Sequence, residues 1–436
     1  MLPAGCIWSS TPKDGGVGVL AQRTSRPHDR LPVDDAGGPR ARAFQFSGVA
    51  QRASWLPARA RSLLLIGSQP RRLADVLSRG RNNFDLIRLL AALTVIFGHS
   101  FYLFPTGGYH EPVTLLVQRN FSGTLAVGTF FFISGMLISQ SFQRSNAPLR
   151  FVLMRIARIY PGSIACLLVT VFAIGAATTS LPVASYLVDP RIPCYLRDNW
   201  SFFTQLPVCV TLPGVFTTNH YGPWVNGSLW TLKPEIVCYM YVLVFGCIGC
   251  LRSPLRIVTA LAGILLLHAI APAWVPYFSD DHYTDVLKVG LFFIAGVATF
   301  ALREKLPIRL FYAAPLIVIA AILQRTAVQE YALYTALFYC VLVVAASPKL
   351  HRLALPGDYS FGVYVYGFPI QQTVQHFLPD LTSYPSNLIC LPAALIAGYL
   401  SWTFIEHPAL QKAQFLAKRA GKPFGSLIGG GRDAQN

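Results

Sequence analysis

Asp85 to Phe104 reads DLIRLLAALTVIFGHSFYLF, and this stretch decides the fold class of the chain. It is about twenty residues long and strongly apolar, so a helix rising 1.5 Å per residue would carry it across the roughly 30 Å hydrocarbon core of a bilayer. The stretch also holds Arg88 at its start and His99 well inside. Ionisable groups at such depth are costly, so we expect a pocket or a partner to compensate them.

Arg88 and His99 share one face of this predicted helix. Their separation in sequence corresponds to three turns plus roughly 20°, which puts both side chains on one stripe about 16 Å apart. Asp85 lies close to the same stripe. An anionic ligand could then meet Arg88 near one membrane surface while a reactive centre reaches His99 deeper in. The alternative is an interfacial arginine and a histidine that only hydrogen-bonds a neighbouring helix.

The composition of the whole chain is typical of a polytopic membrane protein. Of its 436 residues 53% are hydrophobic and only 13% are charged. The net charge of +17 could suggest nucleic acid, but the basic residues lie in tails and short loops between apolar runs. We therefore interpret them as topology determinants and expect no nucleic-acid partner.

Both ends of the chain differ from the apolar middle. Residues 1–80 are rich in arginine, proline and glycine and show no sustained periodicity, which predicts a disordered basic cytoplasmic extension. Residues 409–436 are expected to form a basic cytoplasmic tail. A transmembrane domain over 84–408 lies between them.

Apolar runs of adequate length predict an all-α polytopic membrane protein with about ten transmembrane helices. When the N-terminus is placed inside, most loop lysines and arginines fall on the cytoplasmic side, and so does the C-terminus. This predicts a multi-pass protein of the plasma (inner) membrane. The ten expected spans are 85–104, 122–142, 152–176, 229–250, 255–272, 286–302, 309–324, 330–346, 360–378 and 387–405.

The cysteines give two weaker signals. Cys194 and Cys209 lie in the longest external connection, about 177–228, where an oxidising compartment would favour a disulfide; the sequence leaves open whether they pair. Cys247 and Cys250 form a CxxC, but no second pair or suitably spaced histidine accompanies them. We therefore predict no metal site.

Three polar motifs interrupt the spans. Gly128 to Gly135 reads GTFFFISG, whose small residues allow close helix packing and whose Ser134 can hydrogen-bond across helices. Arg155 and Arg158, at i and i+3, present two guanidinium groups on one face, a geometry suited to phosphate oxygens, although positive-inside bias alone would also explain them.

The third motif, LWTLKPE, opens the fourth span and contains Trp230 and Glu235. A carboxylate there needs a partner, which Lys233, a histidine or water would supply. Glu235 is expected on the outer side of the bundle, where it would orient a hydroxyl arriving from outside. The alternative is a local Lys233–Glu235 pair at the interface.

Six motifs in this order resemble the acyltransferase 3 family of integral membrane carbohydrate O-acyltransferases. The resemblance covers about 84 to 408, nearly all of the membrane part. It rests on Arg88 and His99 with ten residues between them, FFFISG, RIARIYP, LWTLKPE, Tyr359 to Tyr364 (YSFGVY) and Phe404 to Pro408 (FIEHP).

The resemblance implies a membrane O-acyltransferase that moves an acyl group, usually acetyl, from acyl-coenzyme A to a hydroxyl of a cell-surface or exported saccharide. Arg88 and His99 match the family's essential pair, with His99 as general base or as nucleophile of a covalent intermediate. Arg155 and Arg158, with Ser134, would then hold the coenzyme A, and Glu235 would join the catalytic group. Trp230 and Tyr366 are the expected acceptor-binding residues.

One position departs from the family pattern. Many members carry a histidine after the Tyr-x-Tyr of the ninth span, where this chain has Gly367. The rival function is a transporter or flippase for an anionic metabolite or lipid-linked sugar, in which buried Arg, His and Glu form a substrate path. Such proteins often contain internal repeats, and no clear repeat relates the two halves of this sequence.

Overall fold

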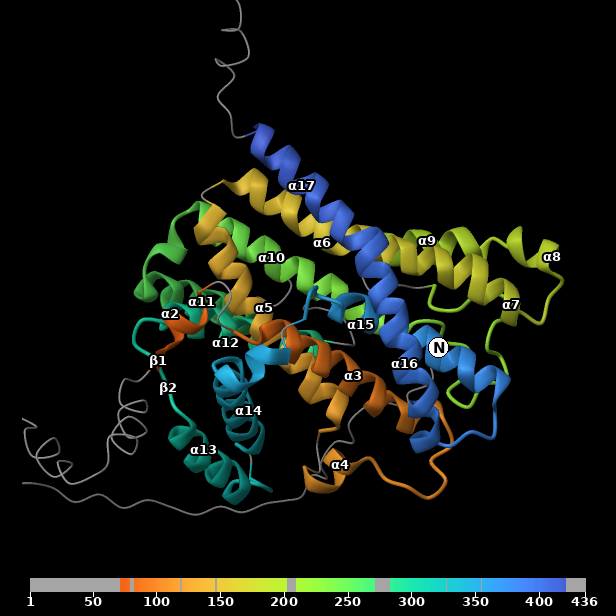
Figure 1. The fold of residues 1–436 in the computed structure, drawn as a ribbon, viewed down its shortest axis with the longest axis horizontal. Coiled ribbons are helices and arrows are strands. Elements are labelled where there is room, and N and C mark those ends of the chain that lie inside the picture. The colour runs from red at the N-terminus through yellow and green to blue at the C-terminus, as the bar shows by residue number, and fades with distance from the viewer. Residues whose placement is uncertain are drawn as a thin grey trace, which may run out of the picture. The chain divides into compact units, whose positions relative to one another are not determined.

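Helices provide nearly all of the regular structure in the described part of the chain (Figure 1). The computed structural model describes residues 71–78, 82–117, 120–145, 147–201, 209–270, 283–326, 328–353 and 355–420. Residues 1–70 and 421–436, which hold most of the two predicted cytoplasmic ends, lie outside the described residues. All described elements belong to one unit, residues 67–436.

The helices follow the chain as a series of long apolar rods joined by short helical pieces. The α-helices are α2 (Leu73–Val76), α3 (Phe84–Leu103), α4 (Pro112–Leu116), α5 (Ser122–Ser145), α6 (Pro148–Val169), α7 (Ala176–Thr178), α8 (Val183–Leu187), α9 (Arg191–Trp200), α10 (Leu232–Cys247), α11 (Pro254–Ile270), α12 (Tyr283–Ala301), α13 (Leu310–Ile322), α14 (Gln329–Ala345), α15 (Ser360–Phe377), α16 (Ser383–Ser401) and α17 (His407–Ala420). The 3-10 pieces are η3 (Gly227–Thr231), η4 (Cys250–Arg252) and η6 (Pro348–Leu353), and the π-helical pieces are η2 (Thr170–Gly175) and η7 (Trp402–Glu406).

A short strand and a short helix precede the first long helix. β1 (Arg71–Arg72) pairs antiparallel with β2 (Pro307–Ile308), and α2 follows it directly. Leu73, Val76 and Leu77 are at most 2% exposed. The predicted disordered extension includes residues 71–78, and burial of this apolar triplet explains why they fold.

Five helical stretches among the described residues are long and apolar enough to cross a membrane. They are Phe84–Leu103, Ser122–Ser145, Pro148–Thr178, Gly227–Cys247 and Ser383–Arg419. Helices also occupy the other predicted ranges, but Leu287–Ala301, Leu310–Ile322 and Gln329–Ala345 are shorter apolar helices. The polytopic helical class is therefore confirmed, whereas the count of ten spans stays a prediction.

Glycine allows the central helices to touch at their backbones. A Cβ on Gly135 of α5 would lie 2.1 Å from the carbonyl oxygen of Phe293 on α12, and a Cβ on Gly296 would lie 2.1 Å from that of Phe132. Both distances are far below a van der Waals contact. The small residues of the GTFFFISG segment therefore serve close packing, as their spacing predicts.

Gly367 has a similar role between α15 and α3. A Cβ at this position would lie 2.6 Å from the side chain of Ile96. One turn later, the buried Gln371 donates a 2.8 Å hydrogen bond to the carbonyl oxygen of Ile96. The departure from the family pattern at Gly367 thus coincides with a close approach of these two helices.

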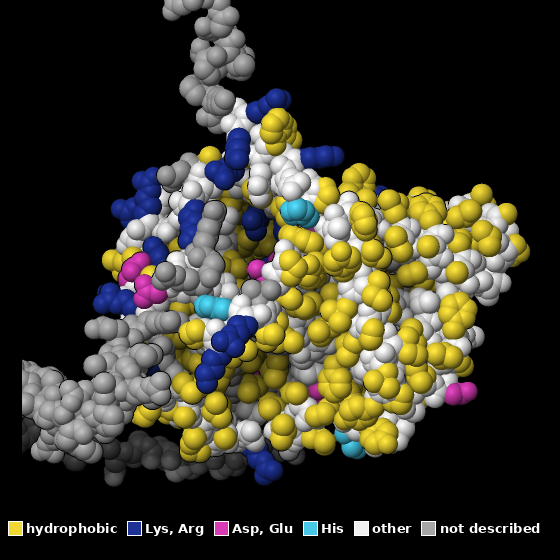
Figure 2. Space-filling model, in the orientation of Figure 1, with side chains coloured by type: hydrophobic (Ala, Val, Ile, Leu, Met, Phe, Trp, Pro, Cys, Tyr) yellow, Lys and Arg dark blue, Asp and Glu magenta, His cyan; other side chains and the backbone are white. Residues whose placement is uncertain are grey.

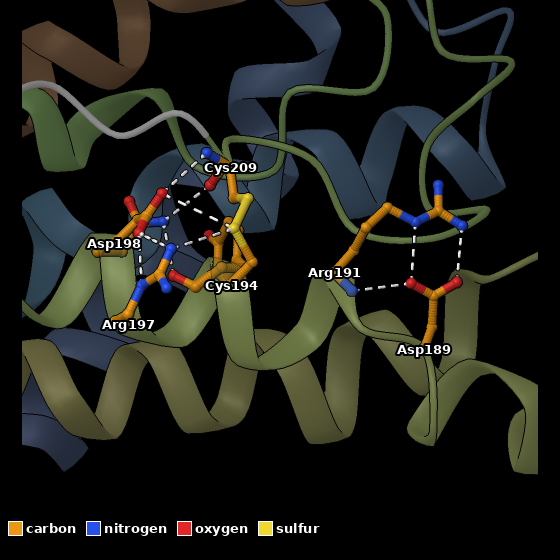
Figure 3. The surroundings of a disulfide bond; sticks show 8 residues. Asp189, Arg191, Cys194, Arg197, Asp198 and Cys209 are labelled. Carbon is orange, nitrogen blue, oxygen red and sulfur yellow. Dashed lines mark hydrogen bonds and ion pairs between the residues drawn. A yellow bond between two sulfur atoms is a disulfide. The ribbon is translucent and has the colours of Figure 1, made fainter.

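The long connection after α7 is held by a disulfide between Cys194 on α9 and Cys209 (Figure 3). The backbone amide of Cys209 also donates to the Asp198 carboxylate at 3.2 Å, and the side-chain amide of Asn199 donates to the Cys209 carbonyl at 3.1 Å. The pairing that the sequence left open is therefore formed. It fixes the start of the segment that leads back to η3.

Charged side chains are unevenly spread over the face seen in Figure 2. Lysines and arginines gather over its left and upper parts, where α11, α6 and α17 lie in Figure 1, whereas the right part is mostly hydrophobic. Large hydrophobic side chains such as Leu90, Phe172 and Leu388 are exposed on the long helices, as expected where lipid replaces water.

Replacing Gly135 with alanine should destabilise the protein by about 1–3 kcal/mol, because the added methyl group has no room against the α12 backbone. Thermal unfolding in detergent would measure the change. Gly263→Ala on α11 is the matched control, since nothing lies within 4 Å of the position that its added methyl group would take. Equal stability of the two variants would contradict the backbone contact between α5 and α12.

Candidate active site

Arg88 and Arg158 meet at one carboxylate, that of Asp358. Asp358 Oδ2 accepts from Arg88 Nη1 at 2.5 Å and from Arg158 Nη2 at 2.6 Å, and Arg158 Nη1 reaches Glu406 at 3.0 Å. All four side chains are at most 18% exposed. The charge that the sequence leaves uncompensated at Arg88 is therefore matched by Asp358.

Local structure explains how these acids reach the arginines. Asp358 directly precedes α15, and Ser360 donates to its other carboxylate oxygen at 2.5 Å. Glu406 lies in the π-helical η7, where an altered helical turn re-aims the side chain. Gly162 on α6 leaves room for it, because a Cβ there would lie 3.2 Å from Glu406 Cγ.

The charge state of Asp358 follows from two opposing effects. Burial raises the pKa of its carboxyl group, whereas the nearby Arg158 and Arg88 guanidinium groups lower it, and the net result is a pKa of about 2. The ordinary value is 3.8. The carboxylate is therefore ionised throughout the neutral range.

Arg155 lies in the same region but makes different contacts. Its guanidinium carbon is 5.9 Å from the ring centres of both Phe151 and Tyr239. Among the described residues it has no ion pair with a carboxylate, and its buried Nε has no hydrogen-bond partner. The Nε of Arg88 is likewise buried and without a partner. Arg88 and Arg155 therefore each have a buried Nε–H group without a hydrogen-bond partner.

Glu235 faces the arginines instead of a separate outer compartment. It accepts hydrogen bonds from Tyr239 on its own helix and, at 3.4 Å, from Ser134 on α5. Glu235 lines the same cavity as Arg88 and Arg158. The short 3-10 helix η3, which precedes α10, places Glu235 within the bundle.

A cavity joins these groups between α3, α5, α6, η3, α10 and α15. Its polar wall consists of arginine, glutamate and hydroxyl side chains, and its remaining wall is aliphatic or aromatic. The lining residues are Arg88, Val127, Phe130, Phe131, Ser134, Arg158, Ile159, Thr231, Leu232, Glu235, Tyr239, Phe361 and Tyr364. Such a site suits a ligand with an anionic group and an apolar arm.

His99 stands beyond the far end of this cavity. Gly98 of α3 packs against Gly123 of α5, and Arg88 and Ser134 both line the cavity, so the two helices run antiparallel. Because Gly98 lies beside Gly123 and the helices are antiparallel, Val127 lies beside residue 94 of α3. Residue 94 is about 7 Å along the helix axis from His99. The cavity therefore extends from Arg88 toward His99 along their shared stripe.

Aromatic rings surround the His99 imidazole. It stacks on Phe121, with ring centres 6.4 Å apart, and meets the edge of Phe368 at 5.6 Å. Phe361 and Tyr364 line the cavity on α15, and Phe368 is one turn further along. The same face of α15 thus connects the cavity to the histidine.

Two predicted acceptor residues lie elsewhere. Trp230 packs partly buried against the hydrophobic core, and Tyr366 is 7% exposed. The structure gives neither of them a place in the cavity wall or a ring contact with His99. Thr231 and Tyr364, from the same two motifs, line the cavity.

The sequence reasoning missed Asp358, Glu406 and Tyr239. Asp358 directly precedes the YSFGVY motif and Glu406 lies inside FIEHP, so both acids stand at motifs already singled out. Acidic residues next to predicted membrane spans could have indicated these two residues, because a carboxylate there needs a cationic partner. Which arginine each would meet depends on long-range packing that spacing does not give.

Only one group of potential metal-ligating side chains comes together in the described residues. Cys194, Asp198 and Cys209 place their ligand atoms within 4.8 Å of one another. The disulfide between the cysteines removes both thiolates, so this group offers a single carboxylate.

Comparison with known proteins shows the family of this chain. A family described as acyltransferase domain matches residues 81–405. The chain belongs to this acyltransferase family. An O-acetyl transferase of Shigella phage Sf6 is 30% identical over 345 residues, which cover 76% of this chain and 97% of that protein. The resemblance stated from the motifs is confirmed, and the helices and the family together identify a membrane-bound acyltransferase.

A second relative covers a smaller part of the acyltransferase. Nodulation protein 10 of Rhizobium leguminosarum bv. viciae is 31% identical over 166 residues, or 37% of this chain and 42% of that protein. No solved structure matches the chain.

Asp358→Asn should lower the free energy of unfolding by about 3 kcal/mol, because it leaves two largely buried guanidinium groups without their shared anion. Chemical unfolding in detergent at pH 7 would measure the loss. Glu304→Gln is the control, since Glu304 is 65% exposed and pairs with Arg303 at the surface, where such pairs contribute about 0–1 kcal/mol.

The same variant has an expected pH dependence. Because folding lowers the pKa of Asp358, its contribution to stability is complete above about pH 4 and is lost as the pH falls toward 2. The stability difference between wild type and Asp358→Asn should shrink over that interval and stay constant from pH 5 to 9. A difference that changes around neutral pH would contradict the assigned charge state.

Proposed function

We propose that this acyltransferase moves an acyl group, acetyl first of all, from acyl-coenzyme A to a hydroxyl of a cell-surface or exported saccharide. The observation that carries the proposal is Arg88, which lines the cavity and has a buried Nε without a hydrogen-bond partner. Arg155 contacts the ring of Tyr239, another residue of the cavity wall, and its Nε is likewise buried without a partner. The Shigella phage Sf6 relative is named an O-acetyl transferase, which supports acetyl as the group transferred.

The phosphates and the pantetheine arm of acyl-coenzyme A match the chemistry of the two ends of the cavity. Guanidinium forks bind phosphate oxygens through paired, charge-assisted hydrogen bonds, and Arg155 and Arg88 would receive the phosphates of coenzyme A. Arg158 is held by Asp358 and Glu406 and would complete the positive rim. The long, flexible pantetheine arm then lies along the aromatic wall and brings the thioester toward His99. Ser134 would contact this arm from α5.

His99 would act as the general base. The imidazole accepts the proton of the saccharide hydroxyl as its oxygen attacks the thioester carbonyl carbon. The carbon–sulfur bond then breaks, and the departing thiolate takes the proton back from the imidazolium. Products are the O-acyl saccharide and free coenzyme A. Glu235, fixed by Tyr239 and Ser134, would supply negative charge near the donor end instead of contacting the hydroxyl.

For topology we propose ten spans with both termini cytoplasmic in the plasma (inner) membrane. A helix occupies each of the ten predicted ranges. The gathering of lysines and arginines over one part of the surface in Figure 2 supports a cytoplasmic side there. With this orientation Arg88 and Arg155 meet a cytosolic donor, and His99 lies deeper in the membrane.

His99→Ala should lower kcat for acetyl transfer by about 10²–10⁴-fold, because the attacking hydroxyl loses its base. The measurement is transfer of radiolabel from acetyl-coenzyme A to envelope polysaccharide of the host by purified protein. Arg197→Gln on α9, 74% exposed, is the control for substitution alone. Equal labelling by wild type and His99→Ala would remove His99 from the chemistry, and label that stays on coenzyme A with wild type would contradict acyl transfer.

Arg155→Gln should raise the KM for acetyl-coenzyme A by about tenfold or more, the expected loss of one charge-assisted phosphate contact. Acetyl-pantetheine, which carries the same thioester without phosphate, is the matched substrate. Its KM should be the same for Arg155→Gln and wild type. An equal rise for both substrates would contradict a phosphate role and indicate general damage to the cavity.

A further inference from the structure

His99 stands in the middle of a continuous row of aromatic rings. The members come from four parts of the chain: the segment before η3, α15, α3 and the residues around the start of α5. In order they are Trp224, Tyr221, Phe368, His99, Phe121 and Tyr102, with neighbouring ring centres 6.5, 6.2, 5.6, 6.4 and 5.2 Å apart.

Some rings of the row are exposed to solvent or lipid, and others are buried. Phe368, next to the histidine, is 5% exposed, whereas Tyr102 at one end is 42% exposed. Trp224, Tyr221 and Phe121 are partly exposed. The imidazole therefore lies beside the buried Phe368 ring, in a row that also contains partly exposed rings.

A buried glutamine fixes the segment that carries Tyr221 and Trp224. Gln372 of α15 is fully buried, and its amide nitrogen donates to the carbonyl oxygens of Gly222 and Trp224 at 3.2 and 2.7 Å. Its amide oxygen accepts from Asn219 at 2.7 Å. All hydrogen atoms of this amide are thus used to hold one short turn.

The rest of the turn is fixed in the same way. Gln375, one turn along from Gln372, accepts a hydrogen bond from the backbone amide of His220 at 3.3 Å. A methyl group on Gly227 would lie 2.6 Å from the Phe368 ring, so the chain leading into η3 passes directly over that ring. The relative positions of Tyr221, Phe368 and His99 are therefore determined by α15.

We propose that this ring row is the acceptor subsite and that it binds a pyranose face by stacking, so that a sugar hydroxyl points at the His99 imidazole. A pyranose presents an apolar C–H face and a rim of hydroxyl groups, and tyrosine and tryptophan combine an apolar face with a polar edge. The inference rests on the proposed function and names residues for its acceptor side.

An aromatic belt at the membrane interface is the competing explanation for exposed tyrosine and tryptophan. A belt requires only that rings lie at the right depth. It does not require a buried glutamine with a full set of hydrogen bonds to the turn, or ring-to-ring contact through to the candidate base. Gln372 is therefore a positioning residue for the acceptor, and it acts through the turn.

Acceptor titrations at saturating acetyl-coenzyme A test the proposal. The variants are Trp224→Leu and Tyr221→Leu, which remove a ring, Trp224→Phe, which keeps one, and Gln372→Glu, which sets a carboxylate oxygen against two carbonyls. The acceptor is envelope polysaccharide of the host. Tyr331→Leu on α14 is the control, because Tyr331 is 73% exposed and lies outside the row.

Each leucine variant should raise the KM for polysaccharide by about 3–10-fold, as expected for loss of one stacking contact, with kcat and the KM for acetyl-coenzyme A unchanged. Trp224→Phe should recover most of the affinity, and Gln372→Glu should resemble the leucine variants. Filter binding of radiolabelled acetyl-coenzyme A verifies that each variant is folded and binds donor.

Unchanged polysaccharide KM in both leucine variants would overturn the acceptor subsite and leave these rings as an interface belt, with wild-type transfer intact. A loss of donor binding together with acceptor binding would also overturn it, because the rings would then support the fold generally. Failure of wild type to transfer any label would contradict the proposed function itself, and the subsite with it.

Discussion

The arrangement depends on one carboxylate shared by two guanidinium groups inside an apolar bundle. Asp358 lies between Arg88 of α3 and Arg158 of α6. Both guanidinium groups are largely buried, so each needs an anion nearby, and removal of one member of such a buried group is costly. Because the three residues come from distant parts of the chain, their contact fixes α3, α6 and the start of α15 together and thereby forms one end of the cavity.

This charge network also separates two kinds of arginine. Arg158 pairs with two acids, whereas Arg155 lies over the rings of Phe151 and Tyr239 and, among the described residues, has a buried Nε without a hydrogen-bond partner. A site of this kind is prepared for an anion from outside. At the other end His99 has rings in place of charges. The contrast between a charged end and an aromatic end supports the proposed transfer from a phosphorylated donor to a neutral sugar.

Much of this could be predicted from the sequence, because hydropathy and periodicity are local. The helical class, the shared face of Arg88 and His99, and the small-residue packing at Gly135 follow from the identity and spacing of nearby residues. The acids could not be assigned in that way, since the Arg88–Asp358 pair spans 270 positions. The partners of Glu235, Tyr239 on its own helix and Ser134 on α5, likewise depend on how α5 and α10 pack.

The central claim is that one continuous path runs from the arginine cavity to His99. The most direct measurement is a cryo-electron microscopy structure of the protein with a coenzyme A derivative that carries a non-transferable acyl group. The account predicts phosphate density within hydrogen-bond distance of Arg155 or Arg88 and the acyl end beside the His99 ring. Donor density outside this cavity, or an acyl end directed away from His99, would contradict it.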